Sequence, residues 1–220
     1  MFVQSWLSLL QHNRAIAVIR AAKKAQAQQM AIAVAAGGML LIEVTWNSDG
    51  SAELIAQLRS ELPECIIGTG TLLNLQQQQQ AIAAGAQFLF SPHLDVEMVR
   101  AAVQQNIPMI PGALSPTEIV TAYAAGATCV KVFPVQALGG VNYIKSLQAP
   151  LGNIPLIPTG GVTLANARDF IDAGAIAVGL ASELFPQQLV QTGNWDAIAQ
   201  LAKTLMQQLR NSPKYPTKSD

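Results

Sequence analysis

One junction recurs along this chain: an alanine-rich helical segment ends in glycine, and a run of apolar, strand-forming residues follows at once. The glycines of these junctions are Gly37-Gly38, Gly85, Gly126 and Gly174. Glycine after a helix adopts the left-handed cap conformation at little cost, so each junction indicates a helix end and a strand start. Asn106, between Gly85 and Gly126, can play the same part. The intervals from Gly85 to Asn106 and from Asn106 to Gly126 are 21 and 20 residues. This length fits one strand, one helix and their turns, which predicts a βα repeat.

Apolar runs of strand length predict eight buried parallel strands. They span residues 15–19, 40–45, 65–69, 87–90, 108–111, 128–133, 155–158 and 175–178. Eight units in 220 residues leave 27.5 residues each, which is short but sufficient for a (β/α)8 TIM barrel of the α/β class. The alternative is an open doubly wound sheet. Such sheets usually carry a glycine-rich turn after their first strand, whereas here Ile19 is followed by Arg20 and Ala21.

The remaining segments are interpreted around this barrel. Residues 2–11 are predicted to form an extra N-terminal helix, with Trp6, Leu7 and Leu10 on the face that covers one end of the barrel. The glutamine tract 76–80 is interpreted as a solvated helix face. Residues 1–210 are predicted to be a single domain, and the polar segment 211–220, with its two prolines, a flexible C-terminal tail.

Charge and hydropathy exclude several functional classes. Thirteen Lys and Arg balance thirteen Asp and Glu, so nothing draws the chain as a whole to nucleic acid or an anionic membrane. The longest uncharged apolar stretch, 25–42, holds three glutamines in its first turns and Gly37-Gly38 near its end, which argues against a membrane span. The first 14 residues lack the features of a signal peptide, so we expect a cytoplasmic protein with reduced, buried Cys65 and Cys129.

Two ionisable residues are predicted to lie inside strands. Lys131 alone among the seven lysines, and Glu43 alone among the thirteen acids, sits within an apolar strand. Burial lowers the pKa of a lysine, so at neutral pH a fraction of the molecules carries the neutral, nucleophilic amine. This amine is the form that makes a Schiff base with a ketone. The alternative is a buried Lys–Glu pair with a structural role only. No cluster of His, Cys and carboxylates has metal-ligand spacing, so we predict a site without metal.

Strand alternation indicates which side chains share a face. It places Lys131 with Cys129 and Phe133, Glu43 with Leu41 and Thr45, Thr71 with Ile67 and Thr69, and Thr159 with Ile157. If the purely aliphatic faces pack on the helices, then Lys131, Glu43, Thr71 and Thr159 point into the barrel near the carboxyl ends of the strands. One amine and one carboxylate would then share a cavity.

Glycines after the last two strands indicate an anion site. Gly160-Gly161 follows the seventh strand, and Gly179, Leu180, Ala181 and Ser182 follow the eighth. Backbone N–H groups can approach a bound anion at such glycines, and this position is the common phosphate site of (β/α)8 barrels. The pattern therefore favours a phosphorylated substrate.

These residues belong to motifs that resemble a known family. The motifs are VIRA at 18–21, GG-x4-EVT at 37–45, GTGT at 68–71, SPHLD at 91–95, IPG at 110–112, KVFP at 131–134, PTGG at 158–161 and GLAS at 179–182. From about Ala15 to Arg210 the chain resembles the bacterial class I 2-keto-3-deoxy-6-phosphogluconate aldolases, a family that includes 4-hydroxy-2-oxoglutarate aldolases.

The resemblance implies a role for each site residue. Lys131 would form the imine with the keto acid, and Glu43 would act as general base and acid. Thr71, Phe133 and Thr159 would line the pocket, while Gly160, Gly161 and Ser182 would hold the phosphate. It implies no metal or organic cofactor, and a homotrimer.

One position departs from the family pattern. Many members carry an arginine two residues after the EVT threonine, where it meets the substrate carboxylate, but this chain has Asn47 there. Other members lack that arginine and, like this chain, have one at the end of the first strand. Arg20 is therefore the expected carboxylate partner.

The resemblance implies a lyase that reversibly splits 2-keto-3-deoxy-6-phosphogluconate into pyruvate and glyceraldehyde 3-phosphate. The alternatives are the same chemistry on 4-hydroxy-2-oxoglutarate or on the phosphogalactonate epimer. A further alternative, from another class, is a phosphate-binding barrel without catalysis.

Overall fold

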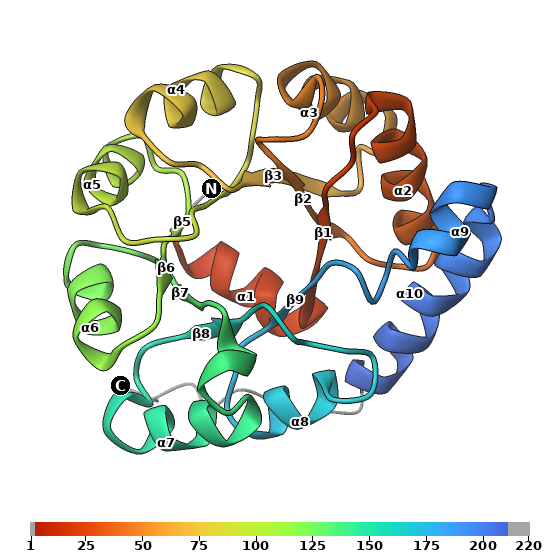
Figure 1. Cartoon of the computed structure of the whole chain (residues 1–220). Helices are drawn as coiled ribbons and strands as arrows, with labels where there is room; N and C mark the ends of the chain where they lie inside the picture. The colour runs from red at the N-terminus through yellow and green to blue at the C-terminus, as the bar shows by residue number, and fades with distance from the viewer. Residues whose placement is uncertain (1–2, 211–220) are drawn as a thin grey trace.

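Helices and parallel strands alternate along the residues that the structure, a computed structural model, describes, which are 3–210. The strands are β1 (Ala15–Ile19), β2 (Leu41–Thr45), β3 (Ile66–Gly70), β4 (Leu89–Phe90), β5 (Met109–Ile110), β6 (Gly112–Ala113), β7 (Val130–Val132), β8 (Leu156–Pro158) and β9 (Val178–Leu180). Together they form an α/β fold with a curled parallel sheet, and Figure 1 shows most helices arranged around it.

The helices follow the strands in turn. They are α1 (Val3–Asn13), α2 (Lys24–Ala36), α3 (Ser51–Glu61), α4 (Leu75–Ala83), α5 (Val96–Gln104), α6 (Pro116–Ala124), the 3-10 helix η1 (Val135–Leu138), α7 (Val141–Leu151), α8 (Ala167–Asp172), α9 (Gln187–Thr192) and α10 (Trp195–Arg210). None of the helices in the described part of the chain is long and apolar enough to cross a membrane. The predicted tail, 211–220, lies outside the described residues.

The predicted helix caps are confirmed by the backbone. Gly38, Gly85, Gly126 and Gly174 have φ between 89° and 105°, and Asn106 has φ 55°. These are left-handed conformations, which glycine adopts freely and asparagine tolerates. The alanine-rich helices therefore end where the chain needs to turn into the next strand.

The predicted fifth strand differs from the observed one. Residues 108–111 were expected to form a single strand, but the structure has β5 and β6 on either side of Pro111. Proline has no N–H to donate to a neighbouring strand, which interrupts the ladder. As a result β5 pairs with β4, and β6 pairs with β7. The sheet thus has two pieces, with the strand orders β5-β4-β3-β2-β1-β9 and β6-β7-β8.

Two apolar clusters lie on opposite faces of the sheet. Ile42, Val44, Val130 and Val132 belong to the cluster between the strands and the surrounding helices. Leu41, Cys129 and Ile157 belong to a smaller inner cluster. Side chains of β2 and β7 thus alternate between the two faces, as predicted from period two.

Helix α1 contributes to the inner cluster. Figure 1 shows it crossing the space that the strands surround. Trp6 and Leu10 are fully buried there, and the Trp6 ring lies 4.9 Å from that of Phe88. Phe88 in turn lies 5.8 Å from Phe90. The inner cluster also holds Ile16, which is near the beginning of β1, so α1 packs against the side where the strands begin.

The glutamine tract is only partly solvated. Gln78 of α4 is 1% exposed, and its Nε2 donates to Met98 O of α5 at 3.1 Å. The prediction of a fully solvated face was therefore wrong at Gln78, because α4 packs against α5.

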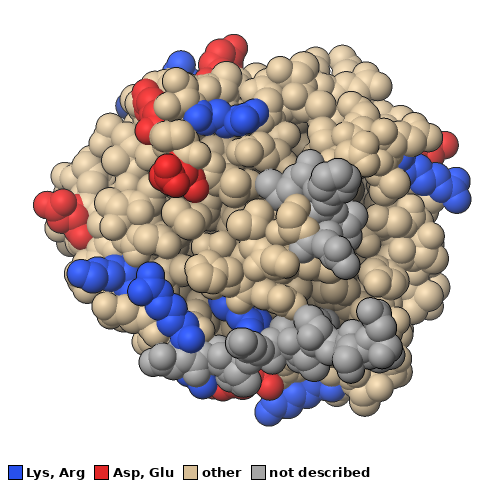
Figure 2. Space-filling model, turned by 180° about the vertical axis from the view of Figure 1, so that it is seen from behind, with Lys and Arg blue, Asp and Glu red and all other residues tan. Residues whose placement is uncertain are grey.

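The surface carries few charges on the face opposite to the view of Figure 1. Figure 2 shows acidic and basic side chains scattered over it, with uncharged residues covering most of the area.

Candidate active site

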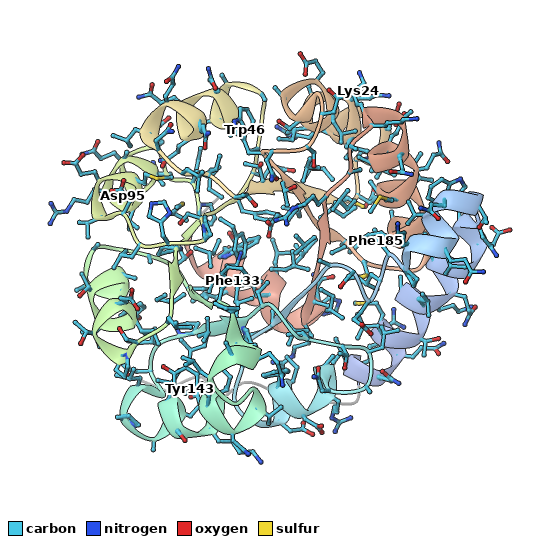
Figure 3. All side chains as sticks on the ribbon, viewed as in Figure 1. Lys24, Trp46, Asp95, Phe133, Tyr143 and Phe185 are labelled. Atoms are coloured by element: carbon cyan, nitrogen blue, oxygen red, sulfur yellow. The ribbon has the colours of Figure 1, made fainter. Side chains whose placement is uncertain are left out.

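A cavity of about 650 Å³ opens where the strands end. All nine predicted site residues line it: Arg20, Glu43, Thr71, Lys131, Phe133, Thr159, Gly160, Gly161 and Ser182. They come from the ends of six strands and the turns that follow them, so residues up to 162 positions apart meet there. Figure 3 shows Phe133 near the middle of the curled sheet, and Phe185 displaced from it toward α2 and α9.

Lys131 is held in β7 between two neighbouring strands. It pairs with Gly112 of β6 and Ile157 of β8, and is 6% exposed. Its Nζ lies 4.6 Å from the centroid of the Phe133 ring and 5.9 Å from that of Phe90. Burial lowers the pKa of this amine; the charge of Glu43 opposes the shift, and that of Arg20 adds to it. Lys131 is therefore biased toward its neutral, nucleophilic form.

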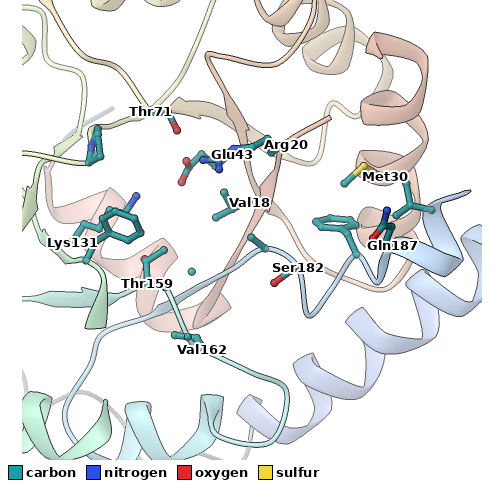
Figure 4. A pocket seen from close by; sticks show the side chains of 18 of the residues that line it. Val18, Arg20, Met30, Glu43, Thr71, Lys131, Thr159, Val162, Ser182 and Gln187 are labelled. Atoms are coloured by element: carbon teal, nitrogen blue, oxygen red, sulfur yellow. The ribbon is translucent and has the colours of Figure 1, made fainter. Parts of the chain in front are cut away.

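Glu43 lies across the cavity from Lys131, in β2, and Figure 4 shows both side chains directed into the same space. It is 2% exposed, and the structure gives its Oε1 no hydrogen-bond partner. Burial raises the pKa of this carboxyl, while the charges of Lys131 and Arg20 act against the rise. Its unsatisfied oxygen fits a proton-transfer role toward a bound hydroxyl or water.

Lys131 and Glu43 share a cavity without forming an ion pair. Within residues 3–210, neither side chain has an oppositely charged partner within 4.0 Å. A purely structural pair gains most from direct contact, because the attraction between two charges weakens with distance while the cost of their desolvation remains. The observed separation leaves room for reacting atoms between the amine and the carboxylate.

Two strand glycines make room for these side chains: Gly70, which the sequence reasoning gave no role, and Gly179, which it assigned only to the anion site. A Cβ on Gly70 would overlap Oε1 and Cδ of Glu43, and one on Gly179 would lie 2.7 Å from Thr159 Oγ1. Glycine inside a strand is a known sign of close approach by another group. The two glycines of GTG at 68–70 could have indicated such a close approach, but the sequence reasoning treated them only as part of the GTGT motif.

The predicted face of β3 was wrong. Ile67 was expected to point inward with Thr71, but it packs in the helix-side cluster. The inner face belongs to Gly68 and Gly70, because Phe88 and Glu43 fill the space beside them. Thr71 still lines the cavity, since it lies beyond the end of β3 with a left-handed φ of 62°. That conformation costs a β-branched residue about 1–3 kcal/mol and breaks the alternation.

The turn after β8 carries two glycines in left-handed conformation. Gly160 has φ 82° and Gly161 has φ 97°. A Cβ on Gly160 would lie 3.1 Å from the Phe133 ring, and one on Gly161 would overlap the Gln136 side chain. Among the described residues, the N–H groups of these two glycines donate to no acceptor. Two such N–H groups, in a cavity that the exposed Ser182 also lines, are able to bind an anion.

Arg20 follows β1 at the rim of the cavity. It is exposed, in contrast to the residues of β1 before it. Figure 4 shows it beside Glu43, and its charge acts on both Glu43 and Lys131. A guanidinium at this rim can bind a carboxylate of a ligand through paired hydrogen bonds.

Sequence reasoning did not anticipate one part of the cavity. It is lined from α2 and from the segment through α9, by Gln26, Met30, Phe185, Gln187, Val190 and Gln191. Gln26 and Met30 are four positions apart on α2, as are Gln187 and Gln191 on α9. Helical spacing could have grouped them, but nothing in the sequence indicates that α2 and α9 face one cavity.

A buried amine and a buried carboxylate at the carboxyl ends of parallel strands define an α/β enzyme with a nucleophilic lysine. Comparison with known proteins agrees. The chain belongs to the KDPG and KHG aldolase family, whose model matches residues 7–201.

Individual relatives support this assignment. The chain is 35% identical over 196 residues to the "KHG/KDPG aldolase" of Escherichia coli strain K12, covering 89% of this chain and 92% of that protein. The fold is similar to that of KDPG aldolase from Legionella pneumophila with pyruvate captured as a covalent carbinolamine, with TM-score 0.84, 28% identity and coverage of 90% and 97%. It is also similar to a protein cage designed by fusing symmetric oligomeric domains, with TM-score 0.81, 32% identity and coverage of 90% and 72%.

Proposed function

We propose that this protein is a class I aldolase that reversibly cleaves 2-keto-3-deoxy-6-phosphogluconate to pyruvate and glyceraldehyde 3-phosphate. The observation that carries the proposal is the pair Lys131 and Glu43, both buried, both facing one cavity and not in ion-pair contact. The E. coli relative, named for both KHG and KDPG, supports the substrate class. It also keeps 4-hydroxy-2-oxoglutarate as a second candidate substrate.

Lys131 begins the reaction. Its neutral amine attacks the C2 ketone to give a carbinolamine, which loses water to become an iminium ion. Glu43 takes the proton of the C4 hydroxyl, and the C3–C4 bond breaks. The electron pair of that bond moves toward the iminium ion, which becomes an enamine. The C4 fragment leaves as the aldehyde. Protonation at C3 and hydrolysis of the imine then release pyruvate and restore the amine.

The other cavity residues position the substrate in this proposal. Arg20 binds the carboxylate next to the ketone, and Thr71, Phe133 and Thr159 line the pocket around the reacting carbons. Gly160, Gly161 and Ser182 hold the phosphate, which is supported by the two N–H groups that have no acceptor among the described residues. No metal or organic cofactor takes part in these steps.

The curled sheet is proposed to be a closed (β/α)8 barrel with α1 covering one end, within a single domain of residues 1–210. Support comes from contacts between the two sheet pieces. Thr159 bridges to Gly179 between β8 and β9, and Ile176 N donates to Leu156 O at 3.0 Å. Across the divided fifth strand, Thr128 N donates to Met109 O at 3.3 Å and Lys131 N to Pro111 O at 2.9 Å.

A cytoplasmic homotrimer completes the proposal. The similarity to a cage assembled from symmetric oligomeric domains supports self-association. The reactants that the proposal names are soluble metabolites, which fits the expected location.

Trapping the imine tests the function. The protein is incubated with pyruvate, reduced with borohydride, and digested for mass spectrometry of the peptides. A reduced pyruvate adduct is expected on Lys131, absent from Lys131→Ala and present in Lys145→Ala, which removes an exposed lysine of α7. Absence of an adduct from folded wild-type protein would favour a phosphate-binding barrel without catalysis.

A further inference from the structure

The catalytic cavity has an arm that the proposed reaction does not use. Beyond Ser182 it continues into a space between α2 and α9, and Figure 4 places Met30 and Gln187 there, with Ser182 between them and the Lys131–Glu43 pair. We define the arm by six residues: Gln26, Met30, Phe185, Gln187, Val190 and Gln191. Because arm and catalytic centre form one cavity, a ligand held at Lys131 can extend into it.

The arm has an apolar floor. Met30 is 3% exposed and Phe185 is 7% exposed, and both belong to the helix-side apolar cluster. Val190 of α9 is half-buried beside them. Such a surface packs against the carbon chain of a ligand, as in most small-molecule sites, where apolar walls carry a few oriented polar groups.

The polar groups of the arm are three uncharged amides. Gln26 is half-buried, whereas Gln187 and Gln191 are exposed. Within residues 3–210 no side-chain hydrogen bond engages these amides. Each amide offers both a donor and an acceptor, which matches hydroxyl groups, since these also do both.

Charge distinguishes the arm from the rest of the cavity. The ionisable residues that line the cavity, within the described chain, are Arg20, Glu43 and Lys131, and none belongs to the arm. A phosphate in the arm would therefore lose its water without meeting a cation. The arm suits neutral, hydroxylated carbon chains, whereas the turn at Gly160 and Gly161 suits the anion.

We propose that this arm binds the far end of aldehyde substrates that are unphosphorylated, polyhydroxylated and longer than three carbons. The inference rests on the proposed aldolase function and widens its substrate class. In the bond-forming direction, C3 of the Lys131 enamine attacks the aldehyde carbon, Glu43 gives a proton to the aldehyde oxygen, and water releases the product from the amine. The first carbons of the aldehyde lie beside Ser182, and later carbons with their hydroxyls enter the arm.

The test compares aldehydes of increasing length in aldol addition to pyruvate. D-glyceraldehyde, D-erythrose and D-ribose are used, and kcat/KM is expressed per free open-chain aldehyde, because the longer sugars cyclise. Two added hydrogen bonds predict a rise of about tenfold from the three-carbon to the five-carbon aldehyde. An absent or reversed rise in the wild-type protein overturns the inference.

Variants of α9 locate the effect. Gln187→Trp fills the arm from an exposed position and is expected to abolish the rise, whereas Gln188→Trp, exposed but outside the cavity lining, keeps it. Gln191→Leu, which removes one amide without adding bulk, is expected to reduce the rise about threefold. A rise that persists unchanged in both arm variants also overturns the inference.

The borohydride adduct of pyruvate on Lys131 is measured in every protein. Its presence shows that the first half of the chemistry works, so a missing chain-length effect then counts against the arm alone. Its absence from folded wild-type protein overturns the aldolase function and the inference with it.

Discussion

Replacing Gly70 with alanine should displace the Glu43 carboxylate and leave Lys131 in place. Gly70 ends β3, with a backbone conformation outside the left-handed region, so alanine meets no backbone strain there. The added Cβ would overlap Glu43 Oε1 and Cδ and lie 3.1 Å from Cγ. Non-bonded heavy atoms prefer separations of about 3.5 Å or more, so the carboxylate must move by about 1 Å or more.

The expected loss follows from the role proposed for the Glu43 carboxylate. A displacement of about 1 Å can cost 10²-fold in rate, and removing a general acid or base costs about 10²–10⁴-fold. We therefore expect kcat for cleavage to fall by about 10²–10⁴-fold, or about 3–5 kcal/mol of transition-state stabilisation. Overpacking should also lower the free energy of unfolding, by about 1–3 kcal/mol.

Three measurements separate this effect from general damage. Urea unfolding reports the stability of Gly70→Ala, steady-state kinetics report kcat, and borohydride trapping with pyruvate reports the Lys131 imine, which should still form. Glu43→Asp shortens the side chain and withdraws the carboxylate from Gly70. The double variant Gly70→Ala, Glu43→Asp should therefore lose less kcat than the losses of the two single variants combined. Wild-type kcat in folded Gly70→Ala would refute the reasoning, and loss of the imine would show that the damage extends to the amine.

Three further predictions concern the charged residues. Arg20→Ala should raise KM for pyruvate about tenfold or more by removing charge-assisted hydrogen bonds, and unchanged pyruvate kinetics would exclude Arg20 from that role. The rate of imine formation against pH should have its midpoint below the usual lysine pKa of 10.5. The charge of Glu43 raises the pKa of Lys131, so the midpoint should fall further in Glu43→Gln, which lacks that charge, and a rise would contradict this assignment. Burial lowers the pKa of folded Lys131 and raises that of folded Glu43, so the charged form of each group is less favourable in the folded than in the unfolded chain, and both charges oppose folding at neutral pH. The double variant Lys131→Met, Glu43→Gln should therefore be about 1–4 kcal/mol more stable to urea at pH 7, and lower stability would show that the pair supports the fold.

The strand and helix order could be read from the sequence because local rules govern it. Glycine and asparagine caps depend only on backbone conformation, and those at Gly85, Asn106 and Gly126 lie where they were expected. Lys131 and Glu43 could be singled out because an ionisable residue in an apolar strand is rare and costly. Period-two alternation then predicted that the two side chains would meet in one cavity.

Features that depend on packing between distant segments could not be read in this way. The inner face of β3 belongs to Gly70 because Glu43 of another strand occupies that space. Gln78 is buried because α5 offers it an acceptor, although its neighbours in the tract suggest solvent. In each case a partner far along the chain reverses the local expectation.

The aromatic residues that connect α1 with the cavity have a chemical consequence. Trp6, Phe88 and Phe90 form a column whose last ring lies 5.9 Å from Lys131 Nζ. These buried rings lie between the amine and the side where the strands begin, so the reactivity proposed for Lys131 depends on α1 as well as on the cavity. Shortening the chain at that end would admit a more polar medium beneath the amine. The nucleophile would then spend more of its time protonated, even with every residue around the substrate unchanged.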